Sequence, residues 1–116
     1  MMSKIVGAIS FSAALCIATA ASAAGMLTDP KGMTLYVFDK DKGKVSSCYG
    51  DCAKHWPPYL SKKGEKMGEG WGTTKRKDGS QQWTYDGHPV YYFASDKKAG
   101  DKTGDGVGGV WHIVTE

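Results

Sequence analysis

The sequence contains few of the side chains that usually carry catalysis. Cysteine and histidine occur only three times each among the 116 residues. The serines form no nucleophile elbow, and no paired histidines mark a metalloprotease helix. His88 lies in an expected turn and His112 on an expected strand, without a nucleophile–base pattern beside either. The sequence therefore gives no support to classical hydrolysis, and we expect no catalytic residue.

An excess of one charge sign is also lacking. The chain has 15 Lys and Arg against 12 Asp and Glu, a formal net charge of +3. This balance is too mild to indicate a nucleic acid or an anionic membrane as a partner. Two local basic clusters, residues 62–63 and 75–77, are typical of solvated loops. The expected partner is an unidentified protein or another component of the cell envelope.

Long hydrophobic runs are absent after the first 20 residues. Before that point, Lys4 precedes an apolar stretch over residues 5–20, and residues 21–23 (Ala-Ser-Ala) form a small-x-small cleavage site. This pattern predicts a signal peptide at residues 1–23 and a single mature domain at residues 24–116. The apolar stretch is too short and too rich in Ala for a convincing membrane span, so we expect none after cleavage.

A lipid-attachment cysteine is missing at the cleavage point. Cys16 follows Leu15 inside the apolar stretch, so we interpret it as part of the signal peptide. No pair of arginines is present, which favours export of the unfolded chain. We therefore expect a periplasmic or secreted protein that carries no lipid anchor.

Helical periodicity is nearly absent, and short β-branched and aromatic segments alternate with turn signals. Residues 50–56, near Cys52, suit one or two helical turns, which the prolines at 57–58 then end. Asp-Gly pairs at residues 78–79 and 86–87 favour tight hairpins. The pattern predicts an all-β domain, a small sandwich or distorted barrel of short antiparallel strands. The expected strands are residues 34–38, 45–49, 70–75, 81–85, 90–94 and 110–115.

The pattern Tyr-x-Phe-x-x-Asp occurs twice, with the copies 55 residues apart. Each copy follows a turn containing Gly and precedes a long polar loop and a tryptophan, Trp56 or Trp111. This order favours an internal pseudo-repeat, with copies at residues 32–60 and 86–115, over a chance likeness of two aromatic strands. The motif residues are Tyr36, Phe38 and Asp41 in the first copy and Tyr91, Phe93 and Asp96 in the second.

The spacing within the motif predicts how its residues are used. Tyr and Phe, two positions apart, project to the same face of a strand, so the two pairs should occupy equivalent core positions. The aspartate, three positions after the Phe, falls at the end of the strand. We therefore expect Asp41 and Asp96 to bond backbone groups in the turns that follow.

The repeated segments resemble a family of small secreted bacterial proteins and lipoproteins with a Yx(FWY)xxD motif, sometimes called a secreted repeat of unknown function. The resemblance covers nearly all of residues 32–115 and implies an exported, β-rich domain with no established activity. Many relatives are lipid-anchored, whereas this chain lacks the required cysteine. The matching segments are Leu35–Asp41, Ser47–Pro58, Gln82–Tyr91 and Gly104–His112.

Cys48 and Cys52 allow three interpretations. A structural disulfide would close a tiny loop and contribute about 2 kcal/mol in the chain-entropy model. A strained short-loop disulfide would also suit thiol exchange, because it is easier to reduce. With His55, the reduced thiols would form a soft-ligand cluster that suits Cu(I), although no complete zinc spacing is present. The methionines that would complete such a site are Met26, Met33 and Met67.

Acidic loops at residues 39–43 and 101–106 loosely resemble calcium-binding loops. Neither has the ligand run of an EF-hand or a closing Glu at the right offset. Asp and Gly also stabilise tight turns, through side-chain hydrogen bonds and positive φ angles. We therefore interpret both loops as turns and expect no cofactor apart from the copper alternative.

Most of the aromatic residues are expected in the core. Four others are candidates for a surface platform that binds sugars or a partner protein: Tyr49, Tyr59, Trp71 and Tyr92. The leading hypothesis is an exported, non-catalytic binding or structural domain. The alternative is a thiol redox or copper-binding protein that uses Cys48, Cys52 and His55.

Overall fold

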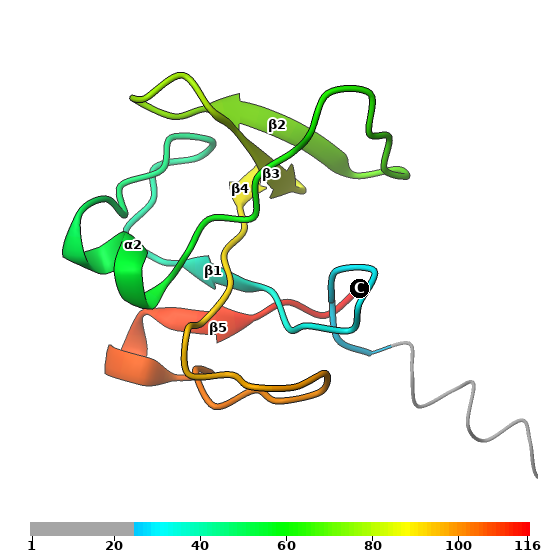
Figure 1. Cartoon of the computed structure of the whole chain (residues 1–116). Coiled ribbons are helices and arrows are strands. Elements are labelled where there is room, and N and C mark those ends of the chain that lie inside the picture. The colour runs from blue at the N-terminus through cyan, green and yellow to red at the C-terminus, as the bar shows by residue number, and fades with distance from the viewer. Residues whose placement is uncertain (1–24) are drawn as a thin grey trace, which may run out of the picture.

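Two antiparallel sheets form the regular structure of the computed structural model, which describes residues 25–116 (Figure 1). The signal peptide expected at residues 1–23 lies outside the described residues. In the described part, β1 pairs with β5, and β3 lies between β2 and β4. The expected all-β class is therefore confirmed. The elements are β1 (Tyr36–Phe38), α2 (Asp51–His55), β2 (Trp71–Lys75), β3 (Gln81–Tyr85), β4 (His88–Pro89), the 3₁₀ turn η2 (Val107–Gly109) and β5 (Trp111–Ile113).

Asp-Gly turns shape the three-stranded sheet. Between β2 and β3, the Asp78 carboxylate accepts the Ser80 N–H at 2.9 Å and Gly79 has a φ of 91°. Between β3 and β4, Asp86 and Gly87 have φ angles of 50° and 81°. Two positive φ angles in a two-residue loop match the twist of the flanking strands. Both hairpins expected from the Asp-Gly pairs are confirmed.

The segment after β4 joins the two sheets, because it runs from the β2–β3–β4 sheet to the β1–β5 pair (Figure 1). Within it, Tyr91 exchanges two backbone hydrogen bonds with Tyr36 of β1, at 2.8 and 2.9 Å. Tyr91 also forms a bridge with Pro58, and Leu60 forms one with Gln82 of β3. Isolated bridges, and no continuous strand in the described residues, connect the sheets at this point.

Two of the expected strands are wrong. Over residues 45–49, only Val45 pairs, in an isolated bridge with Lys42, because the chain then turns towards α2. Over residues 90–94, only Tyr91 pairs, because this segment passes between the sheets. The other expected strands are present, although β1 and β5 are shorter than predicted. No helix of the described residues is long and apolar enough to cross a membrane.

Two clusters of buried side chains fill the interior. One consists of Leu27, Leu35, Tyr59, Trp83 and Val90. The other consists of Tyr36, Cys48, Trp56, Tyr91 and Trp111. Each cluster takes side chains from both halves of the chain, so one half alone would leave its apolar face exposed to water. The two halves therefore build both clusters together.

Candidate functional site

Two phenol–carboxylate hydrogen bonds connect the motif copies. Tyr36 Oη of the first copy donates to Asp96 Oδ2 of the second at 2.7 Å. Tyr91 Oη of the second copy donates to Asp41 Oδ2 of the first at 2.8 Å. The same two tyrosines pair through their backbones where the sheets meet. Each motif copy therefore depends on the other for its side-chain partners.

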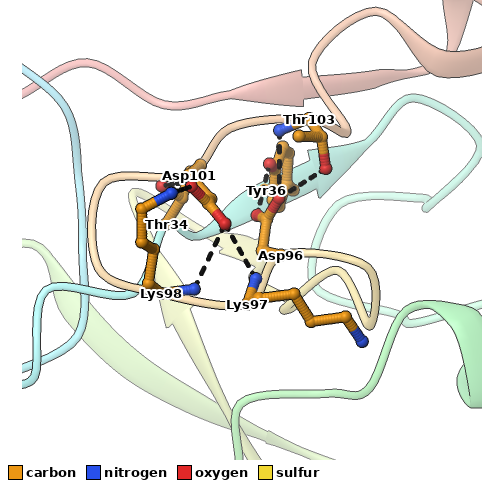
Figure 2. A network of polar contacts seen from close by, with 7 residues as sticks. All are labelled: Thr34, Tyr36, Asp96, Lys97, Lys98, Asp101 and Thr103. Atoms are coloured by element: carbon orange, nitrogen blue, oxygen red, sulfur yellow. Dashed lines mark hydrogen bonds and ion pairs between the residues drawn. The ribbon is translucent and has the colours of Figure 1, made fainter.

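The second oxygen of each aspartate holds the loop after its own motif. Asp96 Oδ1 accepts the Thr103 N–H at 3.0 Å and the Thr103 hydroxyl at 2.6 Å (Figure 2). Asp41 Oδ1 accepts the Ser47 N–H at 2.8 Å and the Ser47 hydroxyl at 2.9 Å. The expected bonding of both aspartates to later backbone groups is thus present. Each carboxylate holds one loop of its own copy and one tyrosine of the other.

Four aromatic rings form a continuous stack between the copies. Trp56 and Trp111 stack at its centre, with ring centroids 3.8 Å apart and an interplanar angle of 2°. Phe38 stacks on Trp111, and Phe93 stacks on Trp56, both with centroids 4.1 Å apart. Gly104 lies against this stack, since a Cβ built there would be 2.6 Å from Trp56. The aromatic residues of the motif thus serve packing between the halves.

Both motif tyrosines are held in the protonated form. Burial raises the pKa of Tyr36, and its hydrogen bond to Asp96 raises this pKa further. Burial also raises the pKa of Tyr91, with the bond to Asp41 acting in the same direction and the bond to Ser46 acting against it. A phenol of this kind is a poor proton acceptor near neutral pH. The motif supplies hydrogen bonds to the fold.

Cys48 and Cys52 form a disulfide, which confirms the first of the three interpretations of this pair. Cys48 is fully buried and Cys52 is half-buried. His55 is exposed on α2, where its Nδ1 lies 3.1 Å from the carbonyl oxygen of Asp51. Residues 25–116 contain no group of three His, Cys, Asp or Glu side chains placed to hold a metal ion. Copper binding stays a prediction for the reduced protein, because a disulfide offers no thiolate.

Arg76 is buried, so the expectation of a solvated loop over residues 75–77 is wrong at its centre. Its side chain is 6% exposed. Nη1 donates to Ser46 Oγ at 3.1 Å and to Gln82 Oε1 at 2.8 Å, and Nη2 donates to the Cys48 carbonyl at 2.8 Å. Arg76 therefore fastens the β2–β3 turn to the disulfide loop. The available signal was that Arg76 is the only arginine in the sequence.

A chain of hydrogen bonds leads from Arg76 to Asp41. Ser46 accepts a hydrogen bond from Arg76, and its hydroxyl oxygen lies 2.5 Å from Tyr91 Oη. Because Tyr91 uses its single proton on Asp41, the Ser46 hydroxyl donates to the phenol. The Arg76 guanidinium also lies over the Tyr49 ring, 4.3 Å from its centroid. The buried cation is thus linked to a carboxylate through two hydroxyl groups.

The pairing of β1 with β5 produces one contact that the sequence pattern missed. His112 Nε2 lies 2.8 Å from Asp39 Oδ2, and both side chains are about half exposed. The register of the two strands places Val37 opposite His112 and brings this carboxylate within reach. The pair of His112 and Asp39 lies at the surface and takes no part in the hydrogen bonds between the motif copies.

The acidic loop at residues 101–106 uses its carboxylates in hydrogen bonds within the fold. Asp101 Oδ2 accepts the N–H groups of Lys97 at 2.9 Å and Lys98 at 3.2 Å, and its Oδ1 lies 3.0 Å from Lys98 Nζ (Figure 2). These contacts, the Lys97 N–H first, lower the pKa of Asp101. Asp105 Oδ1 accepts the Ile113 N–H at 3.1 Å. The hydrogen bonds support the interpretation of this loop as turn chemistry.

A solvent-open cleft of about 250 Å³ lies away from the motif pairs. Two tyrosines form its floor: Tyr59, which is buried, and Tyr92, which is half-buried, with ring centroids 5.3 Å apart. Tyr92 Oη donates to Asp29 Oδ2 at 2.8 Å. Its rim carries the exposed side chains of Lys31, Lys62 and Glu65.

The cleft contains only two of the four aromatic residues expected to form a surface platform. Tyr59 and Tyr92 line it. Trp71 packs edge-on against Tyr59, with ring centroids 6.3 Å apart. Tyr49 lies elsewhere, under the cationic groups of Arg76 and Lys77. A platform made of all four residues is therefore wrong, whereas two of them, the buried Tyr59 and the half-buried Tyr92, line one concave surface.

A family model described as a secreted repeat of unknown function matches the chain twice, over residues 18–59 and 72–115. Each match contains one copy of the motif. Both begin further towards the N-terminus than the copies expected at residues 32–60 and 86–115. The residues added to the second match include β3, which pairs with β4. Neither the curated proteins nor the solved structures provide a match.

Proposed function

Because the chain belongs to the family of secreted repeats of unknown function, we propose that it is an exported, non-catalytic binding domain of the bacterial periplasm or cell exterior. The secreted character of the family and the sequence pattern of residues 1–23 support export. The partner is a component of the cell envelope.

The main support for this proposal is that the polar groups of the motif are occupied by hydrogen bonds within the fold. The phenols of Tyr36 and Tyr91 bond the carboxylates of Asp96 and Asp41, whose remaining oxygens hold loops. A catalytic motif needs a group that is free to exchange a proton or form a bond with the substrate. The repeated residues therefore build a scaffold, and recognition is left to residues outside the motif.

The cleft of Tyr59 and Tyr92 offers such residues. It is concave, and it combines aromatic side chains with charged groups of both signs, as binding sites commonly do. Lys62 and Glu65 belong to residues 60–71, which lie between the two family matches. Because Lys62 and Glu65 are exposed and lie outside the repeat, their side chains are available for a role that the scaffold does not require.

Binding to fractions of the cell envelope tests the proposal. The exported protein is labelled and incubated with polysaccharide, protein and lipid fractions. We expect saturable binding to one fraction, weakened about tenfold or more by the double substitution of Lys62→Ala and Glu65→Ala. Lys102→Ala is the matched control, because Lys102 is exposed and does not line the cleft. Binding to no fraction, or turnover abolished by one substitution, would overturn the proposal.

A further inference from the structure

We infer that the cleft of Tyr59 and Tyr92 binds one ring of a neutral saccharide, with the sugar face against Tyr92 and its hydroxyl groups on the Tyr59 hydroxyl and the charged rim. This inference rests on the proposed binding function and adds the chemical class of the ligand. Four features of the cleft point to it: the tyrosine pair, the balance of charge, the volume and the contrast with the pseudo-equivalent valine pair.

Tyr59 offers the ligand a hydroxyl group and not a ring face, because its ring packs against Trp71, Trp83 and Tyr92. The residue is 8% exposed and lines the cleft, and among residues 25–116 its hydroxyl has no hydrogen-bond partner. A phenol both donates and accepts, so it suits a ligand hydroxyl. Beside it, the ring of Tyr92 is fixed by its bond to Asp29. A pyranose has an apolar C–H face and a hydroxyl edge, which complement the body and tip of tyrosine.

The charges around the cleft balance, with Lys31 and Lys62 opposing Asp29 and Glu65. The acidic pair is partly occupied, because Asp29 accepts from Tyr92 and Glu65 Oε1 accepts the Lys62 N–H at 2.7 Å. A charged ligand would be repelled by half of these groups. Sugar hydroxyls can donate to carboxylates and accept from ammonium groups, so the mixed rim favours a neutral polyol.

Both phenols keep their protons near neutral pH. Burial raises the pKa of Tyr59, and the nearby carboxylates of Asp29 and Glu65 raise it further. Burial also raises the pKa of Tyr92, followed by its hydrogen bond to Asp29. The Tyr59 hydroxyl is therefore able to donate to a sugar oxygen throughout the physiological range.

The volume of the cleft limits the ligand. Its 250 Å³ is below the roughly 300–1,000 Å³ of pockets that enclose drug-sized ligands. One ring fills such a space, and a longer glycan would continue past the rim, where Leu60 is 41% exposed. The inferred ligand is therefore a single sugar unit, either free or within a polysaccharide.

The two tyrosines of the cleft come from different halves of the chain, and neither has a tyrosine at the equivalent position of the other half. At the motif offset of 55 residues, Tyr59 corresponds to Val114 and Tyr92 to Val37. Both valines are half-buried and pack against the core. The repeat fold thus accepts valine at these two positions, so packing alone does not require a tyrosine pair. Of the two pseudo-equivalent pairs, Tyr59 with Tyr92 and Val114 with Val37, only one carries aromatic rings, which is what a single ligand site would produce.

NMR titration of the exported protein tests the ligand class. The probes are glucose, galactose, N-acetylglucosamine and their disaccharides, with glucuronate and inorganic phosphate as charged comparators. We expect saturable shifts of the Tyr59 and Tyr92 ring signals with at least one neutral sugar. Tyr59→Phe keeps the ring and should weaken binding about two- to tenfold, the effect of one hydrogen bond. Lys102→Ala should leave the affinity unchanged.

The outcomes separate this inference from the proposed function. Failure of every neutral sugar to shift these rings, or binding of glucuronate or phosphate in preference, would overturn the saccharide inference. If the double substitution of Lys62→Ala and Glu65→Ala still weakened binding to an envelope fraction about tenfold, the binding function would stand with another ligand. If the unsubstituted protein bound no envelope fraction and no sugar, both the binding function and the saccharide inference would be overturned.

Discussion

The Tyr36 phenol donates to the Asp96 carboxylate at 2.7 Å, although the two residues are 60 positions apart and belong to different motif copies. Tyr91 and Asp41 make the reciprocal bond. The Tyr and Asp of one copy are therefore not partners of each other. A half of the chain would leave both groups unpaired, so the two halves stabilise each other.

The hydrogen bond between Tyr36 and Asp96 should give a measurable coupling energy between the two residues. We expect Tyr36→Phe to lower the free energy of unfolding by about 1.5–3 kcal/mol, the usual effect of losing a hydrogen bond to a charged group. A double-mutant cycle of Tyr36→Phe with Asp96→Asn should give a coupling energy of about 0.5–3 kcal/mol. Urea unfolding followed by tryptophan fluorescence measures all four proteins of the cycle.

The matched control is the pair within one motif copy. Tyr36 and Asp41 share no side-chain hydrogen bond in the described structure. Their substitutions should therefore add within about 0.5 kcal/mol. A larger coupling for Tyr36 with Asp41 than for Tyr36 with Asp96 would contradict the exchange between copies.

Gly104 tests the aromatic stack. A Cβ at this position would approach Trp56 to 2.6 Å and Phe93 to 2.8 Å. We expect Gly104→Ala to destabilise the protein by about 1–3 kcal/mol through overpacking, and to change the near-ultraviolet circular dichroism of the tryptophans. Gly68→Ala is the control, since a Cβ there meets nothing within 4 Å and its φ is not positive. Equal effects of the two substitutions would argue against a tightly packed stack.

Unfolding at alkaline pH should be driven by deprotonation of the buried tyrosines. Burial raises the pKa values of Tyr36, Tyr91 and Tyr92 above that of an unfolded tyrosine. The folded state thus retains protons that the unfolded state releases above about pH 10, so stability is full below that pH and falls as the pH rises. Absorbance at 295 nm and circular dichroism should change in one transition. Tyr91→Phe should make the pH dependence less steep, and an unchanged slope would contradict this linkage.

The sequence predicted the local parts of the fold better than the long-range ones. The Asp-Gly turns, the helical turn before Pro57 and the repeated motif are local patterns, and the structure contains them. The exchange of partners between copies was not predictable, because spacing gives the face of Tyr36 and not the residue that it meets. Burial of Arg76 was missed for a similar reason, since its partners come from residues distant in sequence.

The cleft was predicted only in part. Tyr59 and Tyr92 were both expected at the surface, but their meeting depends on the backbone bond from the Tyr92 N–H to the Pro57 carbonyl. That bond joins the two halves of the chain across a crossing segment that was expected to be a regular strand. Residue types therefore identified the aromatic pair, whereas the sheet topology brought the two rings together.

Arg76 should be essential for the disulfide loop. Arg76→Met removes three hydrogen bonds and leaves buried acceptors on Gln82 and Cys48 without a partner. We expect a loss of about 2–4 kcal/mol in the free energy of unfolding, since each buried group left unpaired costs about 1–3 kcal/mol. Arg76→Lys should restore little, because an ammonium lacks the planar fork. Lys75→Met, at an exposed neighbour, should change stability by less than about 0.5 kcal/mol.

The redox state of Cys48 and Cys52 decides the copper alternative. Protein purified from its native compartment should have a mass two hydrogen atoms below that of the reduced chain, because the two sulfurs are bonded. Added Cu(I) should leave this mass unchanged, since copper binding by cysteine requires deprotonated thiols. Reduction should lower stability by about 2 kcal/mol for so small a loop in the chain-entropy model. Copper retained in the native protein would contradict a purely structural role of the disulfide. A copper site would be established if Cys52→Ser released the metal and His55→Ala weakened its binding.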